Sequence, residues 1–208
     1  MKNLTVITHP LIQRDISILR DRRTPSGQFR QALSRLSALM AYEVTKDLSL
    51  ESFSLTTPLE KTQGYRLSQK IVLVPVLRAG LGMVEGFLNL LPPAKVGHIG
   101  LYRDEETLKP IDYYSKFPKT LKGSLVFLLD PMLATGGSAS AAVTFMKEKK
   151  VTQIRIVCLV VAPQGVRYLT RKHPDVAIYT AALDRRLNTN GYILPGLGDA
   201  GDRFFGTG

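Results

Sequence analysis

The spacing of hydrophobic residues divides the chain into a helical first part and an alternating second part. Between residues 26 and 46, apolar side chains recur every three or four positions, which predicts an amphipathic helix. Thr24 or Ser26 can cap the start of this helix. Beyond residue 70, short β-branched runs alternate with helical stretches that begin near Leu81, Ser138 and Gly165. The runs are Ile71–Val76, Val96–Tyr102, Leu125–Leu129, Ile154–Val161 and Val176–Thr180.

These runs predict an α/β fold with a mostly parallel sheet flanked by helices. Strands that are apolar throughout and separated by helices are typical of a parallel sheet covered on both faces. Pro75 cannot donate to a central ladder, so the first strand is either at an edge there or already ending. The helical N-terminal part and the segment after Leu183 lack the alternation, and we expect them to be additions packed around the core. No linker is visible, so we expect a single domain over residues 1–208.

Composition narrows the class of protein further. Hydrophobic residues make up 44% and charged residues 22% of the 208 residues, which is ordinary globular usage. The longest apolar stretches, Ile71–Leu77 and Ile156–Ala162, are far shorter than the roughly 18 residues of a membrane span. The N-terminus shows no secretory pattern, and the lone Cys158 excludes a disulfide framework. We therefore expect a soluble, cytoplasmic protein with no membrane partner.

Charge is the unusual property of this sequence. Lys and Arg number 28 and Asp and Glu 17, so the formal net charge is 28 − 17 = +11. Such an excess favours an anionic partner, either nucleic acid or a phosphorylated small molecule, although a merely well-solvated surface explains it equally well. The basic residues are scattered and show no alternation with aromatic residues, so we expect no nucleic-acid partner.

The segment Asp130–Ser138 lies between a predicted buried strand and a predicted helix. Backbone N–H groups from Ala134 to Ser138 can converge at the helix N-terminus, where the helix dipole favours a phosphate. Thr135 and Ser138 add hydroxyl donors, and Gly136 and Gly137 allow close approach of a ligand. Asp130, at the strand end, is an acceptor suited to a sugar diol. For the glycines alone, a plain strand–loop–helix joint is an equally good interpretation, and the carboxylate of Asp130 after a buried strand counts against it.

This segment resembles the phosphoribosyl-pyrophosphate (PRPP) motif of the type I phosphoribosyltransferases. Members of that family usually carry two acidic residues at the start of the motif, whereas Pro131 stands in the second place here. That departure, together with three further segments, resembles the uracil phosphoribosyltransferases. The segments are Val74–Gly82, Gly97–Asp104 and Gly191–Arg203. Four long motifs in the right order are specific, although one alone would be only a hint.

The resemblance implies a type I phosphoribosyltransferase-like fold and synthesis of UMP and pyrophosphate from uracil and PRPP, with Arg78, Arg103 and Asp199 as catalytic residues. Arg78 follows a strand-like run and has the guanidinium geometry for phosphate; a structural pair with Glu85 is the alternative. Arg103 is the first residue of a charged stretch. In members of the family, the corresponding loop folds over bound PRPP. The residues implied to bind PRPP are Arg78, Arg103, Asp130, Pro131, Met132, Leu133, Ala134, Thr135, Gly136, Gly137, Ser138 and Asp199.

The glycine-rich segment near the C-terminus resembles the family's base-binding loop. Gly196–Gly201 fits G-x-G-x-x-G, but only seven residues follow it, so a dinucleotide-binding unit is excluded. Uracil alternates N–H and C=O groups along its edge much as a peptide does, so main-chain groups can recognise it. The resemblance implies uracil contacts from Ile193, Gly198 and Ala200, with Asp199 between the base and PRPP.

The resemblance also implies further ligands and assembly. Mg²⁺ is implied, held mainly through PRPP oxygens and water, and we assign no metal-ligating residue in the chain. The family forms homo-oligomers, and GTP activates some members. The alternative function is a non-catalytic nucleotide- or RNA-binding regulator of the same fold, which the net charge of +11 keeps open.

Overall fold

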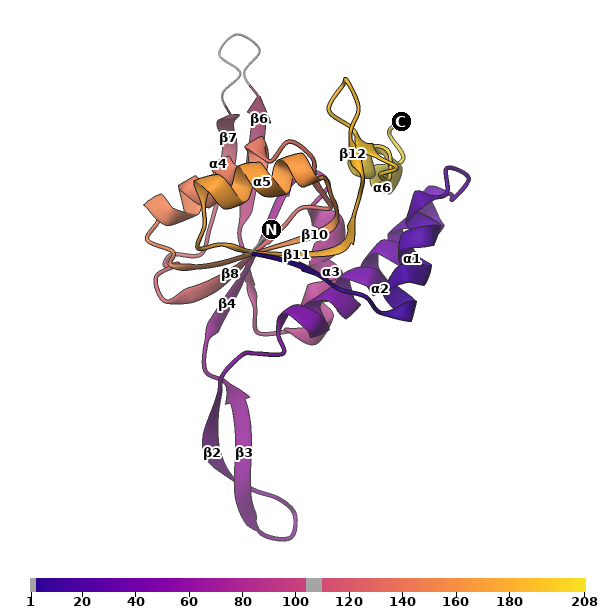
Figure 1. Cartoon of the computed structure of the whole chain (residues 1–208). Helices are drawn as coiled ribbons and strands as arrows, with labels where there is room; N and C mark the ends of the chain where they lie inside the picture. The colour runs from indigo at the N-terminus through magenta and orange to yellow at the C-terminus, as the bar shows by residue number, and fades with distance from the viewer. Residues whose placement is uncertain (1–2, 104–109) are drawn as a thin grey trace.

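A twisted, mostly parallel sheet forms the centre of the molecule (Figure 1). The computed structural model describes residues 3–103 and 110–208, with side chains described over 3–100 and 113–208. Within that part of the chain, neighbouring strands of the central sheet run parallel except β6 and β7, which are antiparallel. The spatial order is β1 (Leu4–Val6), β11 (Ala177–Leu183), β10 (Gln153–Val161), β8 (Ser124–Leu129), β4 (Lys70–Leu77), β6 (His98–Arg103) and β7 (Pro110–Lys116). Two short strands extend it, β5 (Lys95–Val96) beside β4 and β9 (Met132–Leu133) beside β10.

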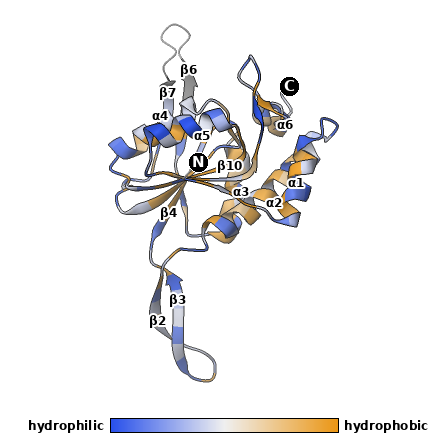
Figure 2. Ribbon diagram, viewed as in Figure 1, coloured by the Kyte–Doolittle hydropathy of each residue, from blue (hydrophilic) through white to orange (hydrophobic). Residues whose placement is uncertain are grey.

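Helices cover both faces of this sheet, as the apolar strands predict. On one face lie α1 (Pro10–Arg20), α2 (Ser26–Val44) and α3 (Leu81–Leu90), and on the other lie α4 (Gly137–Glu148) and α5 (Pro163–Lys172). The strand β8 separates the two cores, because Leu125, Phe127 and Leu129 face one and Val126 and Leu128 face the other. Figure 2 shows the hydrophobic colours concentrated on α2, α3 and the strands. The predicted strand runs and helix starts are confirmed, except that the run Val96–Tyr102 is divided between β5 and β6.

The expected caps of the first helix are wrong, and the expectation for Pro75 in the first strand is met only in part. The amphipathic helix is confirmed as α2, but its N-cap is Pro25, and neither Thr24 nor Ser26 caps it. Thr24 instead donates its hydroxyl to the Ile18 carbonyl at 2.6 Å, which fixes the turn between α1 and α2. The second correction concerns Pro75, which lies within β4, a central strand that continues to Leu77.

A gap in strand pairing explains why Pro75 is tolerated. On one side of β4, pairing passes from β5 to β6 between Leu73 and Val76, and Pro75 has no register partner there. On the other side, Pro75 stands opposite Leu129 of β8. The missing N–H of proline therefore falls at an interruption of the ladder.

Elements outside the core are more numerous than the sequence predicts. The N-terminal β1 joins the sheet edge beside β11, and the hairpin of β2 (Leu50–Thr56) and β3 (Lys61–Leu67) projects away from the body (Figure 1). After the last long strand, β12 (Arg186–Leu187) pairs with β13 (Ile193–Leu194), and α6 (Ala200–Phe205) follows. The helical N-terminal and C-terminal additions are thus present. None of the helices in the described ranges has the length and apolar character needed to cross a membrane.

Candidate active site

Three polar side chains stand where parallel strands end at one edge of the sheet. Arg78 follows β4, Asp130 follows β8, and Asp184 follows β11. The turn after Arg78 passes directly over the end of β8, because a Cβ built on Gly80 would lie 2.3 Å from the Leu129 carbonyl oxygen. Ligands of open parallel sheets bind at this carboxyl edge.

The segment from Asp130 to Ser138 is anchored to β10 by backbone hydrogen bonds. The Pro131 carbonyl accepts hydrogen bonds from the amides of Leu159 and Val160, at 3.0 and 3.1 Å. The helix α4 begins at Gly137, and Gly136 is its N-cap in the left-handed conformation, with φ +86°. The first amides of a helix have no acceptor within it, so they are oriented for an anion at this point. The predicted phosphate loop is therefore at a helix N-terminus.

Asp130 lies at the base of this loop in a poorly hydrated position. Its half-buried carboxyl has a pKa raised from 3.8 to about 6, because burial penalises the charged form and a hydrogen bond from the Met132 amide only partly compensates. The neighbouring Cys158 thiol is fully buried, and burial together with the Asp130 charge raises its pKa. Cys158 is therefore an inert core residue, and Asp130 is a carboxyl of this edge with a raised pKa.

Arg78 is more than half exposed and contacts the last helix. Its Nη2 lies 3.1 Å from Oδ1 of Asp202, and its guanidinium lies 5.7 Å from the centre of the Phe205 ring. The expected structural alternative, a pair with Glu85, is wrong because the partner is Asp202. An exposed ion pair of this kind contributes little to stability, so Arg78 can exchange Asp202 for a stronger anion.

The glycine-rich loop and α6 lie beside Arg78. Ile193 is buried in β13, Gly198 has φ +74°, and Ala200 is the buried first residue of α6. Asp199 caps α6 by accepting a hydrogen bond from the Asp202 amide at 2.9 Å. A Cβ built on Gly201 would lie 3.3 Å from Oδ1 of Asp199 and 3.7 Å from Cβ of Ala79. The residues expected to bind uracil therefore adjoin the Arg78 turn.

The hairpin before this loop reaches the phosphate loop. A Cβ built on Gly191 would lie 3.9 Å from the methyl group of Thr135. The structure thus brings three of the predicted segments together: the Arg78 turn, Asp130–Ser138 and the glycine-rich loop. Arg103 ends β6, but its side chain and residues 104–109 lie outside the described part of the chain.

Two residues of this edge had no role assigned from the sequence. Asp202 pairs with Arg78, and Arg203 donates to the carbonyls of Leu197 at 2.8 Å and Asp21 at 2.6 Å. Beside Asp199, a cavity of about 350 Å³ is lined by Arg22, Thr24, Ser26, Asp199, Asp202, Arg203, Gly206 and Gly208. Asp202 and Arg203 both lie in the segment Gly191–Arg203, which the sequence analysis singled out, and that was the available signal. Their partners could not be read from it.

The described side chains do not form a metal site of their own. No group of three or more His, Cys, Asp or Glu residues with metal-binding geometry occurs among them, and Pro131 occupies the place of a second acid beside Asp130. A divalent cation therefore does not fit a site built by these residues alone.

Comparison with solved structures defines the class of fold. The hypoxanthine phosphoribosyltransferase of Trypanosoma cruzi superimposes with a TM-score of 0.53 at 13% identity, covering 76% of this chain and 75% of that one. At that identity the likeness concerns the fold, which is that of a type I phosphoribosyltransferase. The AQ2163 protein of Aquifex aeolicus is much more similar, with a TM-score of 0.92, 39% identity and 97% of each chain covered.

Sequence comparison places the chain within that class. The family model for uracil phosphoribosyltransferase matches residues 6–207. The uracil phosphoribosyltransferase of Finegoldia magna is 57% identical over 208 residues, covering 100% of both chains. The chain belongs to the uracil phosphoribosyltransferase family.

Proposed function

We propose that this protein transfers the phosphoribosyl group of PRPP to uracil, giving UMP and pyrophosphate, within one domain spanning residues 1–208. The observation that carries the proposal is the meeting of three segments at one sheet edge. The Arg78 turn, the Asp130–Ser138 loop and the glycine-rich loop adjoin one another. Membership of the uracil phosphoribosyltransferase family supports the same assignment.

In this proposal PRPP is held at the edge by charge and by backbone amides. The 5′-phosphate lies at the start of α4, where the helix dipole and the hydroxyls of Thr135 and Ser138 favour it. The Asp130 carboxylate accepts hydrogen bonds from the ribose hydroxyls. Its pKa of about 6 leaves it ionised above that pH. The proposed PRPP residues are Arg78, Arg103, Asp130, Pro131, Met132, Leu133, Ala134, Thr135, Gly136, Gly137, Ser138 and Asp199.

Uracil is recognised through the main chain of the last loop. Main-chain groups of Ile193, Gly198 and Ala200 read the edge of the base, and Asp199 lies between base and PRPP. A backbone N–H facing the O4 oxygen of uracil would meet an amino donor in cytosine. A buried donor facing a donor leaves both unpaired, and such mismatches reject analogues by up to about 10⁴-fold.

The reaction breaks the bond between ribose C1′ and a pyrophosphate oxygen and forms one between C1′ and uracil N1. Negative charge grows on the leaving pyrophosphate, and Arg78 and Arg103 stabilise it more in the transition state than before. Uracil loses its N1 proton, and Asp199 is the proposed group of the loop that either receives this proton or orients the base. The phosphate loop and Asp130 hold the sugar in position for attack.

Mg²⁺ belongs to this proposal as part of the substrate. As the family resemblance implies, the ion would be held mainly through PRPP oxygens and water. When bound in this way it neutralises charge on the pyrophosphate.

Assembly, activation and location complete the proposal. We propose a homo-oligomer, because the β2–β3 hairpin projects from the body and exposes Leu50, Phe53, Tyr65 and Leu67, while a cavity of about 420 Å³ opens at its base. A second copy of the chain is the proposed occupant of this surface. Activation by GTP rests on the family resemblance, and adding GTP to the assay below tests it. A cytoplasmic location is proposed from the sequence, which shows no secretory pattern and has one cysteine, Cys158.

One assay tests the central claim. Pyrophosphate release from PRPP is measured with uracil, with cytosine, with hypoxanthine and without a base. Turnover that requires uracil supports the proposal. Turnover only with another base, or binding of PRPP or RNA without turnover, would replace it with another transferase or with a non-catalytic regulator.

A further inference from the structure

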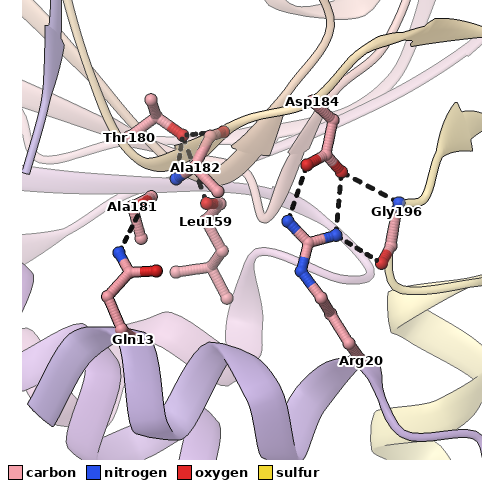
Figure 3. A network of polar contacts seen from close by, with 8 residues as sticks. All are labelled: Gln13, Arg20, Leu159, Thr180, Ala181, Ala182, Asp184 and Gly196. Atoms are coloured by element: carbon pink, nitrogen blue, oxygen red, sulfur yellow. Dashed lines mark hydrogen bonds and ion pairs between the residues drawn. The ribbon is translucent and has the colours of Figure 1, made fainter. Parts of the chain in front are cut away.

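The N-terminal helix and the end of β11 are joined by a shielded ion pair. Arg20, the last residue of α1, donates from Nη1 to Oδ2 of Asp184 at 2.9 Å and from Nη2 to Oδ1 at 2.6 Å (Figure 3). The Asp184 side chain is only 4% exposed. Its backbone amide donates to the Val161 carbonyl at 2.9 Å, so the carboxylate is anchored to the sheet.

Both members of this pair also hold the backbone of Gly196. Its N–H donates to Oδ2 of Asp184 at 2.8 Å, and its carbonyl accepts from Nη1 of Arg20 at 2.9 Å. Gly196 has φ +65°, and a Cβ there would lie 2.2 Å from the Ile193 carbonyl oxygen. The loop therefore makes a tight turn that only glycine fits, and the ion pair fixes its orientation.

This turn separates the two parts of the proposed uracil site. Ile193 lies before it, and Gly198, Asp199 and Ala200 lie after it. The next residue, Leu197, is held through its carbonyl by Arg203, which also binds the Asp21 carbonyl beside Arg20. Two consecutive residues of the loop are thus attached to the end of α1.

Stability alone is a weak reason for this arrangement. A buried ion pair loses about as much hydration energy as its attraction returns, and apolar side chains often stabilise a fold equally well. A bidentate pair that binds both polar groups of one residue does fix a direction. Recognition of a base by main-chain groups depends on such directions, because a misplaced donor loses its selectivity.

We propose that Arg20 and Asp184 are positioning residues that set the preference for uracil by fixing Gly196. Neither contacts substrate in this scheme; they act through the loop that does. The inference rests on the proposed function and deepens it, by assigning base selectivity partly to a residue of the N-terminal helix.

The test compares Arg20→Lys with a matched control, Arg35→Lys. Lysine keeps the charge but cannot bind both Asp184 oxygens and the Gly196 carbonyl together. We expect Arg20→Lys to raise the KM for uracil about tenfold and to lower the uracil-to-cytosine ratio of kcat/KM by a similar factor. The Kd for PRPP, measured by calorimetry, should remain as in the wild type.

The control loosens a second ion pair with a buried acid. Arg35 of α2 binds Asp15, which is fully buried, at 3.0 Å, and among the described residues its polar partner is this acid rather than the glycine-rich loop. Arg35→Lys should leave base preference within about twofold of the wild type, since independent sites do not couple. A loss of preference as large as in Arg20→Lys would overturn the proposal in favour of general loosening.

A second variant and a second measurement complete the test. Asp184→Asn retains an oxygen that can accept from the Gly196 amide, so the KM for uracil in this variant should lie between those of the wild type and Arg20→Lys. If Arg20→Lys does not fold, Asp184→Asn is used for the test in its place. Hydrogen exchange of residues 193–199 in the free enzyme should be faster in Arg20→Lys than in Arg35→Lys.

The possible failures are distinguishable. If the wild type shows no uracil-dependent turnover, the proposed function fails and the inference fails with it. If the wild type is active and Arg20→Lys keeps both its preference for uracil and slow exchange at 193–199, only the positioning role is overturned.

Discussion

Replacing Asp130 with Asn should stabilise the free protein while weakening PRPP binding. The pKa of this carboxyl rises from 3.8 to about 6 on folding, chiefly because burial penalises its charge. The folded state therefore holds a proton that the unfolded chain has already released between these pH values. Stability falls as pH rises through that window, because the folded state binds more protons than the unfolded state.

The pKa change gives the size of the effect. Each pKa unit corresponds to about 1.36 kcal/mol, so the rise from 3.8 to about 6 means that ionised Asp130 destabilises the free protein by about 3 kcal/mol. This destabilisation is present once the pH exceeds about 6. Asparagine has the same shape, carries no charge and still accepts from the Met132 amide. The variant should gain that stability at neutral pH and nothing near pH of about 4, where the wild-type carboxyl is protonated. PRPP affinity should fall by about 1.5–3 kcal/mol, because a charged acceptor is lost.

Urea unfolding of both proteins from acid to neutral pH measures this difference, and other carboxyls cancel in the comparison. Asp175→Asn is a control of opposite sign. The hydrogen bond from Lys147 at 2.6 Å lowers the pKa of Asp175, so its removal should reduce stability at neutral pH and not in acid. A stability gain in Asp130→Asn that does not change with pH, or a loss at neutral pH, would refute the reasoning.

Three further substitutions test the edge. Arg78→Gln should lower kcat/KM about 10²–10³-fold with little change in Tm, because its ion pair is exposed; a large fall in Tm with activity intact would show a structural role. Thr135→Val should weaken PRPP binding by about 1.5–3 kcal/mol in calorimetry; unchanged affinity would place the 5′-phosphate elsewhere. Gly165→Ala would put a Cβ 2.4 Å from the Ala134 carbonyl oxygen, so it should lower the free energy of unfolding by about 1–3 kcal/mol and also weaken PRPP binding; wild-type PRPP affinity would show that the loop tolerates the shift.

Features that are local in the chain could be read from the sequence. The strand runs, the helix α2 and the start of α4 follow from the spacing of apolar residues, because burial on one or two faces imposes that spacing. The phosphate loop was visible because strand, glycines and helix start are contiguous. The resemblance to a known family supplied residues 193–200 of the base-binding loop, which composition and spacing alone would have left as a turn.

Other features depended on pairing partners that spacing does not encode. Pro75 could be placed within a central strand only once β5 and β6 were seen to meet beside it. The β2–β3 hairpin went unrecognised because its strands are exposed on nearly every residue and their apolar residues do not alternate regularly with polar ones.

The contacts that organise the candidate site were decided by tertiary structure. Arg78 meets Asp202 across 124 residues, and Arg20 meets Asp184 across 164. Each of these side chains could pair with several charges in a chain of net charge +11. The sequence determined which chemical groups are present and the strand ends that carry some of them. The fold determined which of these charges meet, because the direction of the loops at the sheet edge depends on the packing of α1 against β11 and of α6 against α2.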